Sequence, residues 1–359
     1  MPGPATFDTE LLRELTEAPG VPGQEAAVAD IMAARMAGLG QIARDGLGGL
    51  SCTSRGSHDA PRVAIAAHMD EVGFVVREVT EEGFLRFLPL GGWWEQVMLA
   101  QRVRVHTRVG PVDGIVGSKA PHVLPPEERN KVVQRSDMFI DIGASSRTQA
   151  AAWGVRPGDP VVPVSPFGVL HDPDLLVGKA MDDRAGCAIL VETFRALSHT
   201  PHPNTVVGLA TVQEEVGLRG AEAARSIPAD VAIALDVGIA GDTPGMRPEQ
   251  ATARLGKGPL VFIHDASLVP NPRLRDLIAD TAEAEGIPFQ WDALPGGSFD
   301  TGRLQFGSGG TPSVVIGFPA RYIHSAVSIV HRGDLAAAVR LVTAAVAKMD
   351  AATVLGLRG

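Results

Sequence analysis

Five side chains of the kinds that bind transition metals are spread along the sequence: His68, Asp182, Glu215, Asp236 and His324. Each lies at the end of an apolar segment or in a turn. Imidazole and carboxylate groups together are a suitable ligand set for zinc, cobalt or manganese. Because one carboxylate can bridge two ions, the set is also sufficient for two-metal hydrolysis. Spacing alone favours a structural role for any one of these residues, so the sequence around each decides its interpretation.

The segment His68-Met69-Asp70 follows an apolar run. Residues two apart in an extended segment point to the same side. The Asp70 carboxylate is therefore placed to accept the proton of the His68 ring nitrogen that faces away from a metal. A strand-end histidine beside an exposed aspartate would give the same pattern, and these residues alone give the two interpretations equal weight.

Two adjacent aspartates, Asp182 and Asp183, precede Arg184 at the start of an apolar helical segment. Aspartate near a helix N-terminus is a common cap, which explains one carboxylate more easily than two. We expect Arg184 to neutralise Asp183, which leaves Asp182 free to bridge two metals.

Glu214 and Glu215 directly follow a second apolar run. Adjacent carboxylates at the end of a buried strand repel each other unless a cation or a shared proton relieves them. One metal ligand and one general base would account for the pair, because a base must lie near the metals without binding them. Two solvated loop glutamates are the alternative. His324 also lies in a loop, where an isolated histidine is usually not a ligand.

Nucleophilic catalysis by serine or cysteine is disfavoured. Ser118, Ser298 and Ser325 are not part of a G-x-S-x-G motif. Cys52 and Cys187 have no nearby histidine in a partner pattern, and we expect two free thiols.

Short apolar runs that end in polar residues are typical of strands in a buried parallel sheet. Helical segments follow or intervene, and the alternation predicts an α/β fold with a mixed, mostly parallel sheet flanked by helices. Ligands of such folds bind outside the carboxyl ends of the strands. The expected strands are 62–67, 206–212, 230–235 and 313–318, and the expected helices are 183–197, 220–226, 272–285 and 334–349.

Two further helices are expected near the N-terminus. Thr6 or Asp8 would cap the first, which contains Leu15 and ends at Pro19-Gly20. The second would span residues 24–39.

The character of the sequence changes between residues 72 and 165. Short β-rich runs are separated there by glycine, proline and charged turns, with one short helix expected at 147–153. This pattern predicts a small all-β domain inserted into the α/β domain. The α/β domain would then comprise residues 1–71 and 166–359, and the inserted domain residues 72–165.

The composition excludes several classes of function. The chain has 359 residues, 45% of them hydrophobic, and a formal net charge of −9. Without a long run of Lys or Arg, nucleic acid and anionic membranes are not expected partners. We find no signal peptide and no apolar stretch long enough for a transmembrane helix, so we expect a cytoplasmic protein.

Together, these segments closely resemble the M42 family of metallo-aminopeptidases, the tetrahedral or TET-type peptidases, also labelled glutamyl aminopeptidase and formerly endoglucanase M. The resemblance covers nearly the whole chain, and the motifs match the family in both their order and their residues. It rests on AAHMDEVGFVV (66–76), GIVGSKAPHVLPPEERNK (114–131), DMFIDIGASS (137–146), GKAMDDRAGC (178–187), VQEEVGLRGA (212–221), ALDVG (234–238), GKGP (256–259) and PARYIHS (319–325).

The resemblance implies a role for each candidate residue. Asp182 would bridge two divalent ions, zinc first, with cobalt or manganese as alternatives. His68 and Asp236 would complete one metal site, and Glu215 and His324 the other. Glu214 would be the general base, and Asp70 would support His68.

The resemblance also implies a fold and partners. The fold would be a zinc-peptidase-like α/β domain with an inserted β-barrel-like domain that helps dimers assemble into hollow tetrahedral dodecamers. The substrates would be short peptides, shortened from their N-termini.

One loop departs from the family pattern. The usual GGTDA-like segment is one residue longer here, so Gly297, Ser298 and Asp300 are candidates for the substrate pocket, with Asp300 in place of the usual aspartate. Ser118, Lys119 and His122 belong to a family motif in the inserted domain. For these three residues a structural loop is favoured over a catalytic role.

Three other functions compete with an aminopeptidase. A glycosidase needs two separated carboxylates and no metal, which leaves the histidines without a purpose. A metal-dependent dipeptidase or a deacylase of small amides is a closer competitor. A non-catalytic assembly or peptide-binding protein is disfavoured, because all five ligands and the base are intact.

Overall fold

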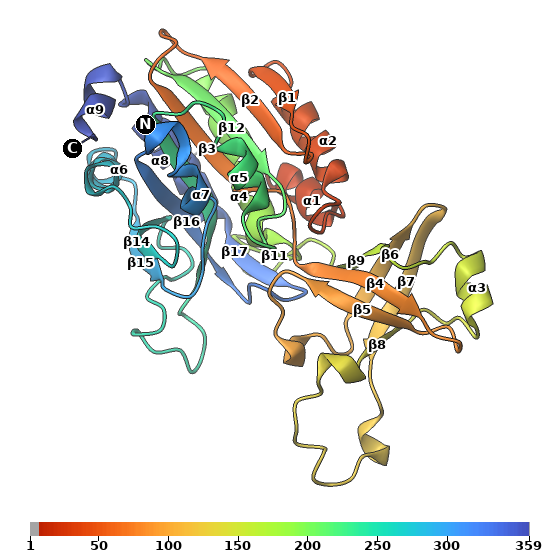
Figure 1. Ribbon diagram of the computed structural model, residues 1–359. Helices are drawn as coiled ribbons and strands as arrows, with labels where there is room; N and C mark the ends of the chain where they lie inside the picture. The colour runs from red at the N-terminus through yellow and green to blue at the C-terminus, as the bar shows by residue number, and fades with distance from the viewer. Residues whose placement is uncertain (1–6, 359) are drawn as a thin grey trace.

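The computed structural model describes residues 7–358, which form a large α/β part and a smaller β-barrel (Figure 1). The α/β part contains an 11-stranded sheet with the path β1-β2-β12-β3-β13-β16-β17-β11-β10, to which β14 and β15 are added beside β16. The barrel is closed by the strands β4-β5-β8-β7-β6-β9. The predicted mixed sheet with an inserted β-barrel is therefore confirmed.

The centre of the sheet is parallel and its margins are antiparallel. Strands β12, β3, β13 and β16 run parallel to one another. The strands on either side of this core pair antiparallel, except that β15 runs parallel to β14. The carboxyl ends of the four central strands therefore meet at one edge, as the sequence predicts for the metal-type residues.

The α/β part has the following elements in chain order. They are α1 (Thr9–Glu17), α2 (Ala26–Met36), β1 (Gln41–Arg44), β2 (Leu50–Arg55), β3 (Arg62–His68), β10 (Gly168–Val169), β11 (Leu175–Gly178), α4 (Met181–Leu197), β12 (Thr205–Thr211), α5 (Arg219–Ala224), β13 (Val231–Ile239), β14 (Leu260–Asp265), α6 (Pro272–Ala284), β15 (Gln290–Leu294), α7 (Thr301–Leu304), β16 (Ser313–Arg321), β17 (Ser328–His331), α8 (Arg332–Ala347) and α9 (Ala351–Gly356).

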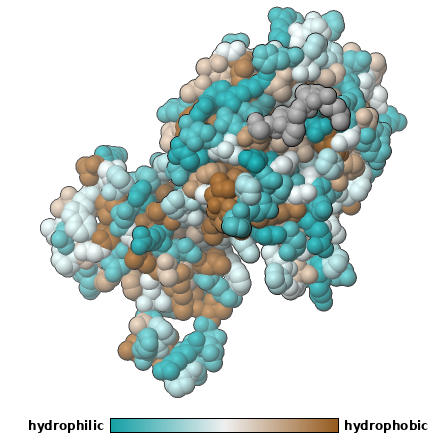
Figure 2. Space-filling model, turned by 180° about the vertical axis from the view of Figure 1, so that it is seen from behind, coloured by the Kyte–Doolittle hydropathy of each residue, from teal (hydrophilic) through white to brown (hydrophobic). Residues whose placement is uncertain are grey.

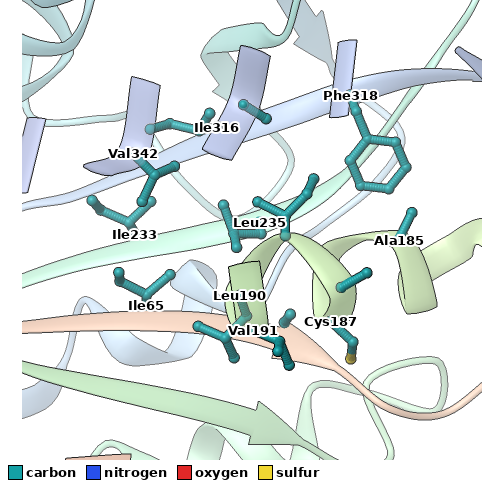
Figure 3. Packing of buried hydrophobic residues seen from close by; sticks show 14 of the residues in the cluster. Ile65, Ala185, Cys187, Leu190, Val191, Ile233, Leu235, Ile316, Phe318 and Val342 are labelled. Atoms are coloured by element: carbon teal, nitrogen blue, oxygen red, sulfur yellow. The ribbon is translucent and has the colours of Figure 1, made fainter. Parts of the chain in front are cut away.

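The two faces of the sheet are covered by different helices. Side chains that alternate along a strand point to opposite faces, and in β3 the larger Val63 and Ile65 join the main core while Ala64 and Ala66 face the other way. The main core lies between the sheet and a layer that includes α4 and α8 (Figure 3). The alanine face packs against α5 and α7.

The barrel has its own hydrophobic core, with Phe74 and Leu85 among its buried residues. A closed barrel leaves no unpaired strand edge. Its elements are β4 (Gly73–Val79), β5 (Leu85–Leu90), β6 (Arg102–Thr107), β7 (Gly110–Gly117), β8 (Phe139–Asp141), α3 (Arg147–Ala152) and β9 (Pro160–Pro163).

The predicted helices are present, with ends shifted by a few residues. Asp8 caps α1 by accepting a hydrogen bond from the backbone N–H of Leu11 at 2.9 Å. Thr6, the other predicted cap, lies outside the described residues. Among residues 7–358, no helix is long and apolar enough to cross a membrane.

Candidate metal centre

The fold brings the five predicted ligands together at the carboxyl edge of the central strands. His68 is the last residue of β3, and Asp236 lies in β13. Glu215 follows β12, and His324 follows β16. Asp182 lies in the first turn of α4, where the backbone is not yet helical.

The five side chains form two groups that share Asp182. In each group the three candidate ligand atoms lie within 4.8 Å of one another. One group is His68, Asp182 and Asp236, and the other is Asp182, Glu215 and His324. Nε2 of His68 is 3.1 Å from Oδ1 of Asp182, and Nε2 of His324 is 3.4 Å from its Oδ2. One carboxylate thus faces both groups, one oxygen toward each histidine.

Both histidines are oriented by backbone carbonyl groups. Nδ1 of His68 donates to the carbonyl oxygen of Asp70 at 3.1 Å, and Nδ1 of His324 donates to that of Gly92 at 2.7 Å. A carbonyl oxygen can only accept, so Nδ1 carries the proton in each ring and a neutral ring has its lone pair on Nε2. The nitrogen that faces Asp182 is the one available to a metal.

The predicted role of the Asp70 side chain is only partly matched by the geometry. Its Oδ1 is 3.6 Å from Nδ1 of His68, too far for a hydrogen bond. Its two oxygens instead accept from the backbone N–H groups of Glu214 and Glu215, each at 3.0 Å. Asp70 therefore holds the turn that carries both glutamates.

The predicted pairing of Arg184 with Asp183 is wrong. The buried Arg184 guanidinium donates to carbonyl oxygens at the end of α1 and beyond, including Leu15 and Ala18. Asp183 accepts from the backbone N–H groups of His68 and Gly186, both at 3.1 Å. The carboxylate nearest to Arg184 is that of Glu71, with Oε1 3.5 Å from Nη2, while Asp183 is held by amides.

The crowding of carboxylates strongly perturbs their ionisation. Burial raises the pKa of Glu215 to about 7, with a further contribution from the Asp182 charge. Burial also raises the pKa of Glu214 and of Asp236 well above the usual range. Burial acts to lower the pKa of His324, but its hydrogen bond to Asp182 and the Glu215 charge raise it to about 10.

These ionisation properties fit a site for bound cations. Several buried carboxylates face only two imidazoles, and such a cluster is costly unless a positive charge compensates it. Oε1 of Glu215 is buried and has no hydrogen-bond partner within residues 7–358, so this oxygen is available as a metal ligand. Nitrogen and carboxylate donors suit divalent transition metals.

A cavity of about 430 Å³ opens over the two groups. Glu214 lines it and belongs to neither group, with Oε2 4.0 Å from Nε2 of His68. Gly297 and Ser298 line the cavity, as the sequence suggested. Asp300 does not line it and is buried, with Oδ2 accepting from the Thr211 hydroxyl and Oδ1 without a partner.

Three residues near the site were not anticipated from the sequence. Gly92 and Arg303 line the cavity, and Glu25 accepts a hydrogen bond from the backbone of Gln213. No motif connects these residues to the ligands in sequence, because each reaches the site from a different element.

Ser118 and Lys119 lie away from the metal-type residues. They line a separate cavity of about 790 Å³ in the barrel, and His122 lies in an adjacent exposed turn. That these three residues belong to a structural loop stays a prediction.

The model of the M42 glutamyl aminopeptidase family matches residues 48–341 of this chain. The chain belongs to the M42 family. Aminopeptidase activity and metal dependence are properties of the family, and the chain is therefore a peptidase. A second model, described only as AMPT, matches residues 8–32.

Several M42 proteins are similar over almost the full length. The glutamyl aminopeptidase of Lactococcus lactis subsp. cremoris is 34% identical over 94% of this chain and 96% of its own. The TET aminopeptidase structure from Thaumarchaeota archaeon SCGC AB-539-E09 is 45% identical, with a TM-score of 0.95 over 97% of this chain and 98% of that one. A Pyrococcus horikoshii TET peptidase that can assemble into a tetrahedron or a large octahedral shell is 29% identical. Its TM-score is 0.84, and the match covers 95% of this chain and 99% of that one.

Proposed function

We propose that this M42 protein is an aminopeptidase that removes N-terminal residues from short peptides with two divalent metal ions. The observation that carries the proposal is the pair of ligand groups sharing Asp182. Zinc suits both groups, and cobalt or manganese would also accept these ligands. His68 and Asp236 would complete one site, and Glu215 and His324 the other.

Glu214 is the proposed general base. Its carboxylate lines the cavity beside His68 but belongs to neither ligand group, as a base that serves a nearby water requires. When bound, the ions would lower the pKa of a water molecule and polarise the scissile carbonyl. Glu214 accepts the proton of the attacking water and returns it to the leaving amine.

The surroundings of Glu214 favour attack near a free N-terminus. The acidic residues Asp182, Asp236 and Glu215 line the cavity around it. The free α-amino group of a substrate would interact with the metal site or its carboxylates, which would place the first peptide bond next to the base.

Self-association through the inserted barrel domain, residues 72–165, is a further part of the proposal. Large apolar side chains are exposed on the barrel, and brown patches are visible on the smaller lobe in Figure 2. Such patches often mark protein–protein contacts. The exposed residues are Leu88, Trp94, Val109, Ile115, Val123 and Val132.

The decisive test is hydrolysis by wild type and Glu214→Gln, measured with metal content. Wild type should cleave aminoacyl-nitroanilides and unblocked peptides, lose activity with a chelator and regain it with zinc, cobalt or manganese. Glu214→Gln should retain its metals and lose about 100-fold or more in kcat, the range expected for removal of a general base. Glu283→Gln, at an exposed position on α6, is the matched control.

Metal-replete Glu214→Gln with wild-type turnover would refute the assignment of the base. Preference for N-acetylated peptides or for dipeptides alone would instead support a deacylase or a dipeptidase.

A further inference from the structure

The turn that carries Glu214 and Glu215 is held by two buried carboxylates from other parts of the chain. Three successive backbone N–H groups, those of Gln213, Glu214 and Glu215, point to carboxylate oxygens. Asp70 accepts the second and third. The first is accepted by Oε1 of Glu25 at 3.1 Å, 188 residues away in the sequence.

Gln213 needs such a restraint more than its neighbours do. Its φ is +56°, in the left-handed region that a residue with a side chain enters at a cost of about 1 kcal/mol. This conformation redirects the chain immediately before Glu214. A charge-assisted hydrogen bond to the Gln213 N–H favours the strained conformation over a relaxed one.

Glu25 is well placed to act as this acceptor. It immediately precedes α2, is 4% exposed and does not cap that helix with its side chain. The same Oε1 accepts from the backbone N–H of Gly23 at 2.7 Å. Two amides from separate segments therefore meet on one oxygen, which links the start of α2 to the turn before the base.

We propose that Glu25 is a positioning residue for catalysis, which fixes the Gln213 backbone and thereby aims the Glu214 carboxylate. This rests on the proposed role of Glu214 as base. Glu25 does not line the cavity. Its effect should fall on the chemical step rather than on substrate binding, because Gln213 directly precedes the base, whereas Glu25 lies outside the cavity in which a substrate would bind.

Glu25→Ala and Glu25→Gln should have different effects on kcat. Alanine removes the acceptor, and kcat should fall about 100-fold at nearly unchanged KM, the size expected for a displacement of about 1 Å. Glutamine keeps one carbonyl oxygen, and both amides already share a single oxygen, so Glu25→Gln should restore most of kcat. Metal content should stay at the wild-type value in both variants, since Glu215 lies one residue further from Gln213 than the base does and its N–H group remains bonded to Asp70.

A second measurement does not depend on activity. Hydrogen exchange of a peptide spanning residues 210–218 should be faster in Glu25→Ala than in wild type, and near wild type in Glu25→Gln. Asp334→Ala is the matched control, because Asp334 is also buried and accepts from two backbone amides, Gly256 and Gly258, each at 2.7 Å, outside the cavity. The Asp334→Ala protein should be less stable than wild type, but its kcat and the rate of hydrogen exchange in residues 210–218 should be unchanged.

Several outcomes would overturn the role of Glu25. They are wild-type kcat in folded Glu25→Ala, an equal loss in Glu25→Gln, an equal loss in Asp334→Ala, or unchanged exchange of residues 210–218. If wild type itself hydrolyses no aminoacyl substrate, the proposed function fails, and the exchange measurement alone still shows whether Glu25 holds the turn.

Discussion

At the scale of single residues, the site is defined by charges that the fold holds away from water. Burial tends to lower the pKa of His68, yet the carboxylates of Glu214 and Asp182 raise it well above its usual range. The same cluster leaves a buried oxygen of Glu215 without a donor. A cation would relieve both conditions, which is why a peptidase can retain so unfavourable an arrangement.

Arg303 is the only arginine or lysine among the described residues that line the cavity. Its side chain is 47% exposed, and its Nε is 4.0 Å from Glu222, which pairs more closely with Arg225 at 3.0 Å. We expect Arg303 to favour substrates with an acidic first residue. Arg303→Met should lower kcat/KM for a glutamyl-nitroanilide about twofold to fivefold relative to a leucyl one, the size of a partly exposed ion pair.

Arg225→Met is the control, since Arg225 also pairs with Glu222 but does not line the cavity. An equal change for both substrates in Arg303→Met would show that this cation does not select the first residue.

Asp292 gives a pH-dependent prediction away from the metal-type residues. Burial raises its pKa to about 6, so the fold favours the protonated form. The favourable contribution is complete below the unfolded pKa of about 4 and is lost as pH rises through 6. Asp292→Asn should therefore raise the free energy of unfolding by about 2 kcal/mol at pH 8, and by much less at pH 4.5. Denaturant unfolding at the two pH values measures the difference, and an identical effect at both would contradict it.

At the scale of elements, the barrel completes the site of the α/β part. Gly92 follows β5 and supplies the carbonyl group that orients His324. The next residue, Trp93, fixes this loop by stacking on Phe74 with ring centroids 4.7 Å apart and by donating to the carbonyl oxygen of Gly73 at 3.1 Å. The position of one candidate ligand thus depends on the packing of the inserted domain.

Gly92→Ala tests this dependence. A Cβ atom at this position would lie 2.9 Å from Nδ1 of His324, so the ring has to move. Because His324 belongs to only one ligand group, we expect metal content to fall from two ions per subunit toward one, with activity lost in parallel. Gly46→Ala, where a Cβ meets no atom within 4 Å, is the control. Full metal content in folded Gly92→Ala would contradict the prediction.

At the scale of the whole molecule, the inserted domain is a closed body with exposed apolar side chains. Val123 is 65% exposed and Ile115 is 50% exposed, both on the barrel. We expect the solution mass to be a multiple of the 37.6 kDa subunit mass. Ile115→Lys with Val123→Lys should reduce this mass, because a buried charge opposes association.

The control for assembly is Leu355→Lys, at an exposed position of α9 in the α/β part. Light scattering of the three proteins measures the mass. A monomeric wild type, or an equal loss of mass in the control, would show that the barrel surface does not mediate association.

The sequence by itself determined the main strands, the presence of an inserted all-β domain and the five metal-type residues. These features are local or periodic: an apolar run ends in His68 or before Glu214, and β-rich runs follow one another from residue 73 to 163. The ordered motifs then identified the family. The pattern of apolar and polar residues that predicts these features lies within short stretches of the chain, so it can be read without the tertiary structure.

Only the tertiary structure decided which groups contact one another across long separations. It directed Arg184 to carbonyls of the N-terminal segment rather than to Asp183, brought Glu25 to Gln213, and placed Gly92 beside His324. A hydrogen bond depends on the final positions of donor and acceptor within about 3 Å, and a sequence with no alignment does not encode these positions locally. The candidate ligands could be named from their residue types and the family resemblance, but the groups that orient them could not.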